Sequence, residues 1–385
     1  MKMKRTVFIV FWLLTAGSVF ASGSYALRPP AVVDVRSLAA GGFHICDVSS
    51  AYMLTVNPAL LAFAGKKVLL PSVAFDIGGP LGDLPDLYSR MTDSGSTGSF
   101  ADVLLDFVGK NNGLDLDVGV SGPLTFGRVN KNRGWGVFNR TYVTGSVPSV
   151  SVSSVTAGEE MVFAGGSAFP LLNFSRMQLS VGVSSKLLVR LEGTYDGAPA
   201  SLTSFDFGSV PVSATVAAGG DIGAYFSLFD IIRFGAVWKN LYAGFVKDAG
   251  TFSHMTLSSA KPPVLLFEKG TLAVGVAFNI PVGFTRGVLS SWTVYCDYAD
   301  VPALFTGSAD AFKVNPVLAL SAGMELVVFD TIALRCGMNG AYASAGAGID
   351  LTPFHLECAV FGKELGLDPG VRAQLHGAFA VSFYY

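Results

Sequence analysis

The sequence is poor in charge and, beyond its first residues, lacks any long hydrophobic run. Only 14% of its 385 residues are charged, whereas 51% are hydrophobic. In a chain of this length that balance usually indicates several membrane helices. The longest apolar stretch after residue 21, at 222–241, is interrupted by Asp230, Arg233 and Lys239. This pattern excludes a helical bundle and leaves a closed β-barrel as the structure that can span a bilayer.

Residues that carry chemistry are scarce as well. The net charge is −2 and the lysines are scattered, which argues against nucleic acid as a partner. No serine elbow or acid–base constellation is found, so we expect no enzyme activity, no cofactor and no metal site. The histidines, which show no metal-ligand spacing, are His44, His254, His355 and His376.

The chain has only four cysteines. Cys296, Cys336 and Cys358 fall in line with the apolar residues of three separate predicted strands, so they are expected to point outward and apart. Cys46 precedes the strands and is expected inside the barrel. We therefore predict no disulfide, although the compartment is oxidising.

The first residues read as a secretory signal. Lys2, Lys4 and Arg5 are followed by the apolar segment 6–16, and 19–21 (VFA) form a cleavage site that ends on a small residue. This order predicts a signal peptide over 1–21, cleaved near Ala21, and hence export to the outer membrane.

The rest of the chain alternates apolar and polar residues. At 375–385 one face carries Leu375, Phe379 and Phe383, and the strand ends on the aromatic Tyr385. This period of two fits a strand with lipid on one side and a lumen on the other. Such patterns predict an all-β fold, a barrel of about 14 antiparallel strands over 66–385. The strands are expected near 66–77, 114–128, 133–145, 159–170, 178–191, 211–227, 231–242, 263–281, 287–299, 315–328, 332–338, 341–351, 354–363 and 372–385.

The connections alternate between short and long. Short turns are expected on the periplasmic side and longer loops outside. The first outer loop is expected to hold short amphipathic helices near 81–93 and 100–110. The short turns are 130–132, 172–175, 228–230, 281–286, 329–331 and 352–353, and the long segments are 78–113, 146–158, 192–210, 243–262 and 300–314.

The segment 22–65 precedes the first strand and is most simply a plug, or hatch, in the lumen. Within it, Asn57, Pro58 and Ala59 read as a helix start, with Asn57 as N-cap and Pro58 at the first helical position.

At this point the chain resembles a known family. VNPALLAFAGKK at 56–67, directly before the first strand, is similar to the FadL family of outer-membrane long-chain fatty acid transporters, in particular the FadL-like proteins of spirochaetes. FGAVWKNL at 234–241 and AGMELVVFDTIALRCGMNG at 322–340 resemble strand motifs shared with PorV-type barrels. The resemblance implies a hatch at 22–65, an apolar ligand between hatch and wall, and sideways release at a kinked strand.

Gly122 and Pro123 are the candidate for that lateral kink, because proline removes a ladder hydrogen bond and glycine permits a bulge. An ordinary bulge that shapes the barrel is the alternative. Phe43 and Ile45 are candidate pocket residues on grounds of apolarity alone.

Glu325 and Arg335 are predicted to form an ion pair in the lumen. If the intervening turn centres on Asp330, the two residues face each other across the hairpin and share the lumen face. Either a structural tie between wall and hatch or a gating role would explain the pair.

Two functions follow. The first is uptake of long-chain fatty acids or similar hydrophobic molecules by hatch-gated lateral diffusion into outer-membrane lipid, by a monomer. The alternative is a PorV-like shuttle or scaffold for secreted or surface proteins. The inner faces carry mainly Gly, Ala and Ser, which separates both from a general porin with its polar channel.

Overall fold

The computed structural model describes residues 27–50, 52–82, 89, 106–109, 113–149, 152–174, 176–198, 206–256, 262–285, 287–302 and 314–383. The expected signal peptide lies outside these ranges, as do Tyr385 and most of the two expected loop helices. Residues 106–109 are helical, and Phe107 and Val108 pack against the start of β2.

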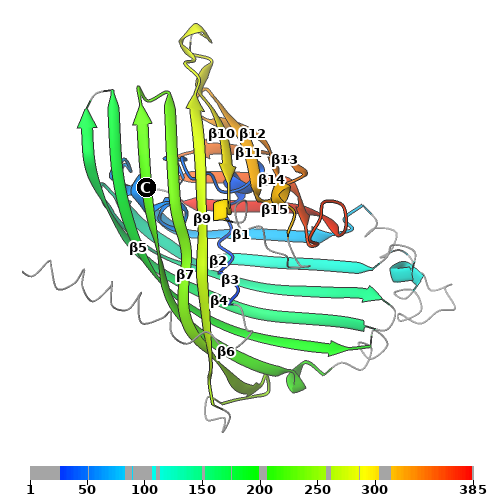
Figure 1. Cartoon of the computed structure of the whole chain (residues 1–385). Coiled ribbons are helices and arrows are strands. Elements are labelled where there is room, and N and C mark those ends of the chain that lie inside the picture. The colour runs from blue at the N-terminus through cyan, green and yellow to red at the C-terminus, as the bar shows by residue number, and fades with distance from the viewer. Residues whose placement is uncertain are drawn as a thin grey trace, which may run out of the picture.

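The described strands form one closed antiparallel barrel (Figure 1). β1 pairs with both β2 and β15, and β6 pairs with β7, so the ring has no free edge. The two-residue β8 (His254–Met255) pairs only with β7 and leaves 14 strands in the wall, which confirms the predicted fold class. The wall strands are β1 (Lys67–Gly79), β2 (Leu114–Asn130), β3 (Arg133–Ser149), β4 (Val152–Phe174), β5 (Met177–Gly197), β6 (Pro211–Leu228), β7 (Ile232–Thr251), β9 (Val264–Asn279), β10 (Leu289–Tyr298), β11 (Leu320–Val328), β12 (Ile332–Asn339), β13 (Tyr342–Leu351), β14 (Phe354–Glu364) and β15 (Ala373–Phe383).

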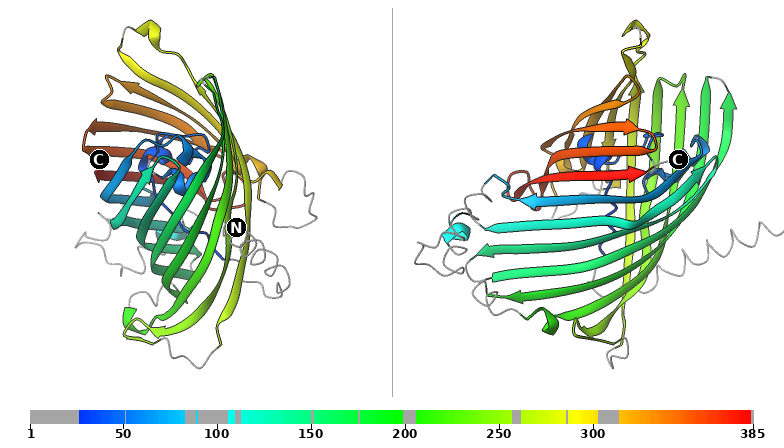
Figure 2. Two further views of the ribbon diagram at one scale, coloured as in Figure 1. Left: turned by 90° about the vertical axis from the view of Figure 1, so that its left-hand side faces the viewer. Right: turned by 180° about the vertical axis from the view of Figure 1, so that it is seen from behind.

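The two halves of the barrel differ in height (Figure 2). β4 has 23 residues and β5 has 21, whereas β12 has 8 and β11 has 9. A tilted strand needs about 9–11 residues to cross a bilayer, so the long strands continue beyond it. The expected loop at 146–158 is wrong: its serine-rich composition resembles a loop, but its residues pair in strand register, as Ser146 with Ser154.

The outer face of the wall is apolar. Large apolar side chains point outward on neighbouring strands and alternate with buried ones, as a bilayer-facing sheet requires. Cys296, Cys336 and Cys358 are exposed and Cys46 is buried, as predicted. Among the described residues, no helix is both long and apolar enough to cross a membrane. Exposed apolar residues include Phe75, Trp135, Val143, Phe163, Val183, Leu187, Phe234, Phe267, Leu334, Val360 and Phe379.

The segment 27–65, called the plug here, lies inside the barrel (Figures 1 and 2, dark blue). Its helices are α2 (Val35–Ala39), α3 (Met53–Val56) and the 3₁₀ helix η2 (Pro58–Ala62). α2 packs against β12 to β15, and η2 packs against β3 to β6. The plug and the inward side chains of the wall form the main hydrophobic core, in which Met53, Leu60 and Leu61 are fully buried. The boundaries of the predicted domains remain a prediction, because 22–26 are not described.

Candidate functional site

The wall is interrupted in strand β2. Between Ser121 and Phe126, β2 advances five residues while its neighbour β3 advances three, from Arg140 to Val137. Relative to β1 on the other side, β2 again has two residues too many. Every other register shift in the described strands inserts a single residue. The segment 122–125 is therefore the largest break in the described ladder, and Gly122 and Pro123 lie in it.

Backbone conformation explains the residue types at the break. Gly122 has a φ of +92°, and a Cβ there would lie 1.9 Å from the carbonyl oxygen of Ser72. Glycine is therefore required at this position. Pro123 cannot donate to the ladder, and β1 carries Pro71 within its own one-residue irregularity.

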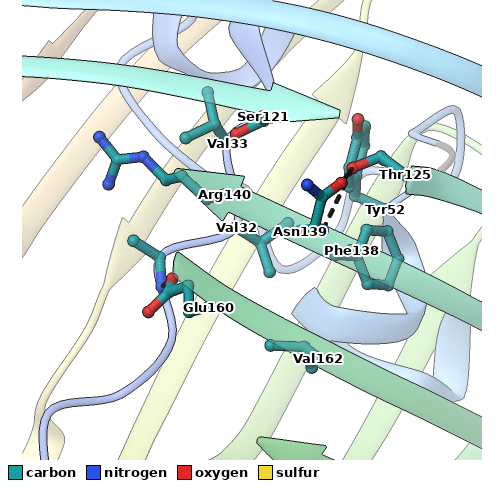
Figure 3. A pocket seen from close by; sticks show the side chains of 11 residues that line it. Val32, Val33, Tyr52, Ser121, Thr125, Phe138, Asn139, Arg140, Glu160 and Val162 are labelled. Atoms are coloured by element: carbon teal, nitrogen blue, oxygen red, sulfur yellow. Dashed lines mark hydrogen bonds between the residues drawn. The ribbon is translucent and has the colours of Figure 1, made fainter. Parts of the chain in front are cut away.

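A small cavity lies on the lumen side of the break (Figure 3). Its volume of about 10 Å³ is room for one water molecule. The plug closes it with an extended stretch at 31–33 and with Tyr52. The wall residues that line it are Ser121, Thr125, Phe138, Asn139, Arg140, Glu160 and Val162.

The extended stretch of the plug, residues 27–33, is clamped to the wall and is called the arm here. Glu160 Oε1 accepts a hydrogen bond of 2.6 Å from the backbone N–H of Ala31. Arg190 forms an ion pair of 2.9 Å with Glu160 and donates to the carbonyl oxygen of Arg28 at 3.0 Å. The arm therefore covers the inner side of the break through directional contacts that can be broken and remade.

A second, larger cavity of about 390 Å³ separates the plug from β1 and from β11 to β15, and reaches the short-turn rim at Asp330 and Thr352. Its lining combines charged side chains with apolar ones such as Val33, Val35 and Val327. Phe43 and Ile45 do not line it: Phe43 packs on the main core, and Ile45 on Val237 and Ala273. Their proposed role in ligand binding stays a prediction.

Glu325 joins wall and plug. Arg335 Nε lies 2.5 Å from Glu325 Oε2, in register across the β11–β12 hairpin. On the other side Arg36 of α2 binds both oxygens of Glu325, at 2.8 and 2.9 Å, and also binds Asp47 at 3.0 Å. Arg335 also pairs with Glu357. Sequence reasoning missed Arg36, because no local pattern relates residues 289 positions apart.

Two buried carboxyl groups of the plug have pKa values shifted in opposite directions. Burial alone would raise the pKa of the Asp47 carboxyl, but the Arg36 guanidinium and hydrogen bonds from Ser49 outweigh it and lower the pKa to about 2. Burial raises the pKa of the Asp34 carboxyl against the opposing hydrogen bond from Ser37. Asp47 is thus fixed as an anion by its neighbours, whereas Asp34 is driven toward its neutral form.

Asn57 fixes η2 from three directions. Its Oδ1 accepts from the Ala59 N–H at 3.1 Å, the capping bond. Its Nδ2 donates to the carbonyl oxygens of Ile45 in the plug and Ala224 in the wall, each at 3.2 Å. The fully buried Asn57 therefore caps η2 and also connects the plug to the wall. Pro58 begins a 3₁₀ helix rather than an α-helix.

His44 also connects the plug to the wall, a role that the sequence analysis did not identify. Its ring nitrogens lie 2.6 Å from Asp297 Oδ2 and 2.8 Å from the Ala40 carbonyl oxygen, and its ring stacks on Tyr295. A spacing-based search for metal ligands cannot detect a histidine whose partners are a carbonyl and a single carboxylate.

No protein-family model and no curated protein matches the sequence. Solved structures that are similar include the Pseudomonas putida toluene transporter TodX, with 13% identity, 94% of this chain and 99% of that chain covered, and a TM-score of 0.46. A Pseudomonas aeruginosa FadL homologue has 13% identity, 94% and 99% coverage, and a TM-score of 0.45. The CymD monoaromatic hydrocarbon channel has 11% identity, 90% and 96% coverage, and a TM-score of 0.47. The similarity concerns the fold.

Proposed function

We propose that this chain is an outer-membrane barrel that takes up long-chain fatty acids or similar hydrophobic molecules and releases them sideways into membrane lipid. The observation that carries the proposal is the two-residue break of β2 at 122–125, which lies directly behind the arm of the plug. A plugged lumen does not suit a general water-filled pore, whereas a wall break covered from inside by a movable segment suits a lateral gate.

The step through the wall has a simple physical basis. An apolar molecule is stabilised by about 0.8 kcal/mol for each CH₂ group that leaves water for lipid. The obstacle is the arm, held at Ala31 and Arg28 by the Glu160–Arg190 pair. Displacement of the arm would join the small cavity to the lumen. The cargo could then pass between β2 and its neighbours, where the ladder is interrupted.

The scaffold alternative is favoured by a different observation. The plug is connected to the wall by the ion pair of Arg36 with Glu325 and by buried hydrogen bonds of His44 and Asn57. A plug that never moves would leave a barrel that displays its loops and rim to partner proteins and transports nothing. Ligand binding separates the two functions.

The test uses purified barrel reconstituted in vesicles, with labelled long-chain fatty acid. A variant that lacks Pro123 and Leu124 removes the two extra residues and preserves the alternation of faces on both sides. A matched control lacks Leu171, which lies at the single-residue shift between β4 and β5. We expect saturable binding in all three proteins, and loss of transfer to the bilayer only in the variant without Pro123 and Leu124. If no protein shows saturable binding, the scaffold function is supported. If the variant without Pro123 and Leu124 still transfers fatty acid to the bilayer, the cargo does not leave through the break in β2.

A further inference from the structure

Four buried polar atoms on the lumen face beside the break have no hydrogen-bond partner among the described residues. They are Asp76 Oδ1, Asp117 Oδ1, Ser121 Oγ and Arg140 Nε. The residues occupy three adjacent strands: Ser121 pairs in register with Arg140, and Asp76 with Gly119, two residues from both Ser121 and Asp117. An open buried donor or acceptor costs about 1–3 kcal/mol, so a cluster of them at one place points to a polar group that binds there.

The cluster is buried. Asp76 is 4% exposed and Ser121 6%. A Cβ at position 119 would lie 2.5 Å from Asp76 Oδ1 and 2.8 Å from Arg140 Nε. Glycine at 119 therefore lets both open atoms lie close together over the backbone of β2. Ser121 and Arg140 also line the small cavity behind the break (Figure 3).

Polar side chains lie on the outer face of the break too. Glu160 reaches inward to the arm, so by strand alternation its neighbour Glu159 points outward. Glu159 accepts hydrogen bonds from Asn139 Nδ2 at 3.2 Å and from Thr141. Glu159 thus places an acidic group on the outer face of the wall, next to the break.

Asn139 connects the two faces. It lines the inner cavity, and its Nδ2 donates to the carbonyl oxygen of Gly122 at 3.3 Å as well as to Glu159 outside. Figure 3 shows its side chain beside Thr125, at the point where β2 leaves the ladder. Hydrogen-bonding groups therefore run from the lumen cluster, through the break, to the lipid face.

We propose that this break passes amphiphiles whose polar head is neutral and carries a hydroxyl, such as long-chain alcohols, with Ser121, Asn139 and Glu159 as a hydrogen-bonding track for the head. The inference rests on the proposed lateral transport and specifies its cargo. A hydroxyl can donate to an open carboxylate oxygen and accept from Arg140 Nε. A pure hydrocarbon would leave these atoms unpaired. A carboxylate head would add a third negative charge beside Asp76 and Asp117, which already share the single guanidinium of Arg140.

The test compares three probes with equal alkyl chains: 1-dodecanol, dodecane and dodecanoate. Binding to the purified barrel is measured by displacement of a fluorescent apolar probe. We expect the alcohol to bind roughly tenfold more tightly than either of the others, as one or two buried hydrogen bonds allow.

Ser121→Ala should weaken alcohol binding about three- to tenfold and leave dodecane binding unchanged. The matched control Ser185→Ala removes a hydroxyl from the exposed side of β5, where it bonds only to Gly165, and should change neither.

A charge variant gives an independent measurement. Asp117→Asn keeps an acceptor oxygen but removes a negative charge, so the affinity for dodecanoate should rise relative to that for the alcohol. Glu159→Gln should slow transfer of the alcohol to the bilayer without lowering its binding. Equal binding of all three probes, unchanged by Ser121→Ala and Asp117→Asn, would mean that the open atoms bind water only, and would overturn this inference while leaving uptake intact. No binding of any probe would contradict both.

Discussion

At the residue scale, close contact between plug and wall depends on glycine. A Cβ at Gly182 would lie 2.4 Å from the Ala59 nitrogen, and a Cβ at Gly223 would lie 2.0 Å from Asn57 Oδ1. Both contacts involve atoms of η2 or its cap, which cannot move aside without breaking the ties of Asn57. The wall therefore accepts η2 only where its inward side chains are absent.

Replacement of Gly182 by alanine should loosen the plug. Overpacking of this kind costs about 1–3 kcal/mol, and here η2 must shift to relieve it. The reporter is the rate at which maleimide labels the buried Cys46, in a background where Cys296, Cys336 and Cys358 are alanine. Labelling should accelerate in Gly182→Ala. Gly165→Ala is the matched control, since a Cβ there meets nothing within 4 Å; equal rates in the two variants would refute the close-packing argument.

The ion pairs of Glu325 should be energetically coupled across the plug boundary. Arg36→Met leaves Glu325 with Arg335 alone, and Glu325→Gln leaves both guanidinium groups without their shared anion. The double-mutant cycle on Arg36 and Glu325, measured by Cys46 labelling, should give a coupling of about 1–3 kcal/mol, as is usual for contacting groups. Additive effects would show that the contact does not hold the plug.

Residue roles were predictable from sequence only where the partner is near in the chain or fixed by register. The pairing of Glu325 with Arg335 follows from counting across one hairpin, and Asn57 follows from its neighbours. Arg36 and His44 could not be assigned, because their partners Glu325 and Asp297 are far away in sequence and their contacts depend on how the plug is seated.

At the scale of elements, alternation identified the wall strands because each has lipid on one face. It could not give their lengths, since the pairing of β3 with β4 continues through serine and threonine beyond the bilayer. The chemistry of glycine and proline placed Gly122 and Pro123 at an irregularity, but it did not give the number of extra residues. That count depends on the partners Ser72 to Ala74 and Val137 to Arg140.

The ion pair between Arg36 of α2 and Asp47 of the turn that follows should be lost at low pH. The pKa of Asp47 is about 2 in the folded protein, below its usual 3.8. Its contribution to plug stability is therefore complete above pH 3.8 and is lost as the pH falls through about 2. The raised pKa of Asp34 acts in the opposite sense, because its protonation relieves the burial of a charge. The protection of plug amides from hydrogen exchange, expressed relative to the intrinsic exchange rate at each pH, should decrease between pH 4 and pH 2.

Asp47→Asn is the control for this pH dependence. It keeps the shape of the side chain but removes the group that titrates, so the protection of plug amides relative to intrinsic exchange should be lower at pH 4 and should change little on further acidification. If the variant retains the full acid response of the original protein, another carboxyl controls the plug.

At the scale of the whole molecule, the cargo has two conceivable exits from the lumen. One is the break in β2. The other is the 390 Å³ cavity that reaches the short-turn rim. The lining of the cavity includes the charged side chains of Arg36, Lys67, Glu325 and Glu357, which an alkyl chain on this path would have to desolvate. Transfer through the wall instead places the chain directly in lipid.

Selective blockage can distinguish these exits. Leu124 lies in the break and is 50% exposed on the outer face, whereas Thr331 lines the cavity near the rim. In a background without the four native cysteines, Leu124→Cys and Thr331→Cys are each treated with a bulky thiol reagent, and delivery of labelled 1-dodecanol and of labelled fatty acid to the surrounding bilayer is followed. If the cargo leaves through the wall, modification at position 124 should stop its delivery to the bilayer. Modification at position 331 should leave delivery unchanged. The reverse pattern would assign transport to the cavity, because a group at 331 cannot obstruct a path that leaves between β1, β2 and β3.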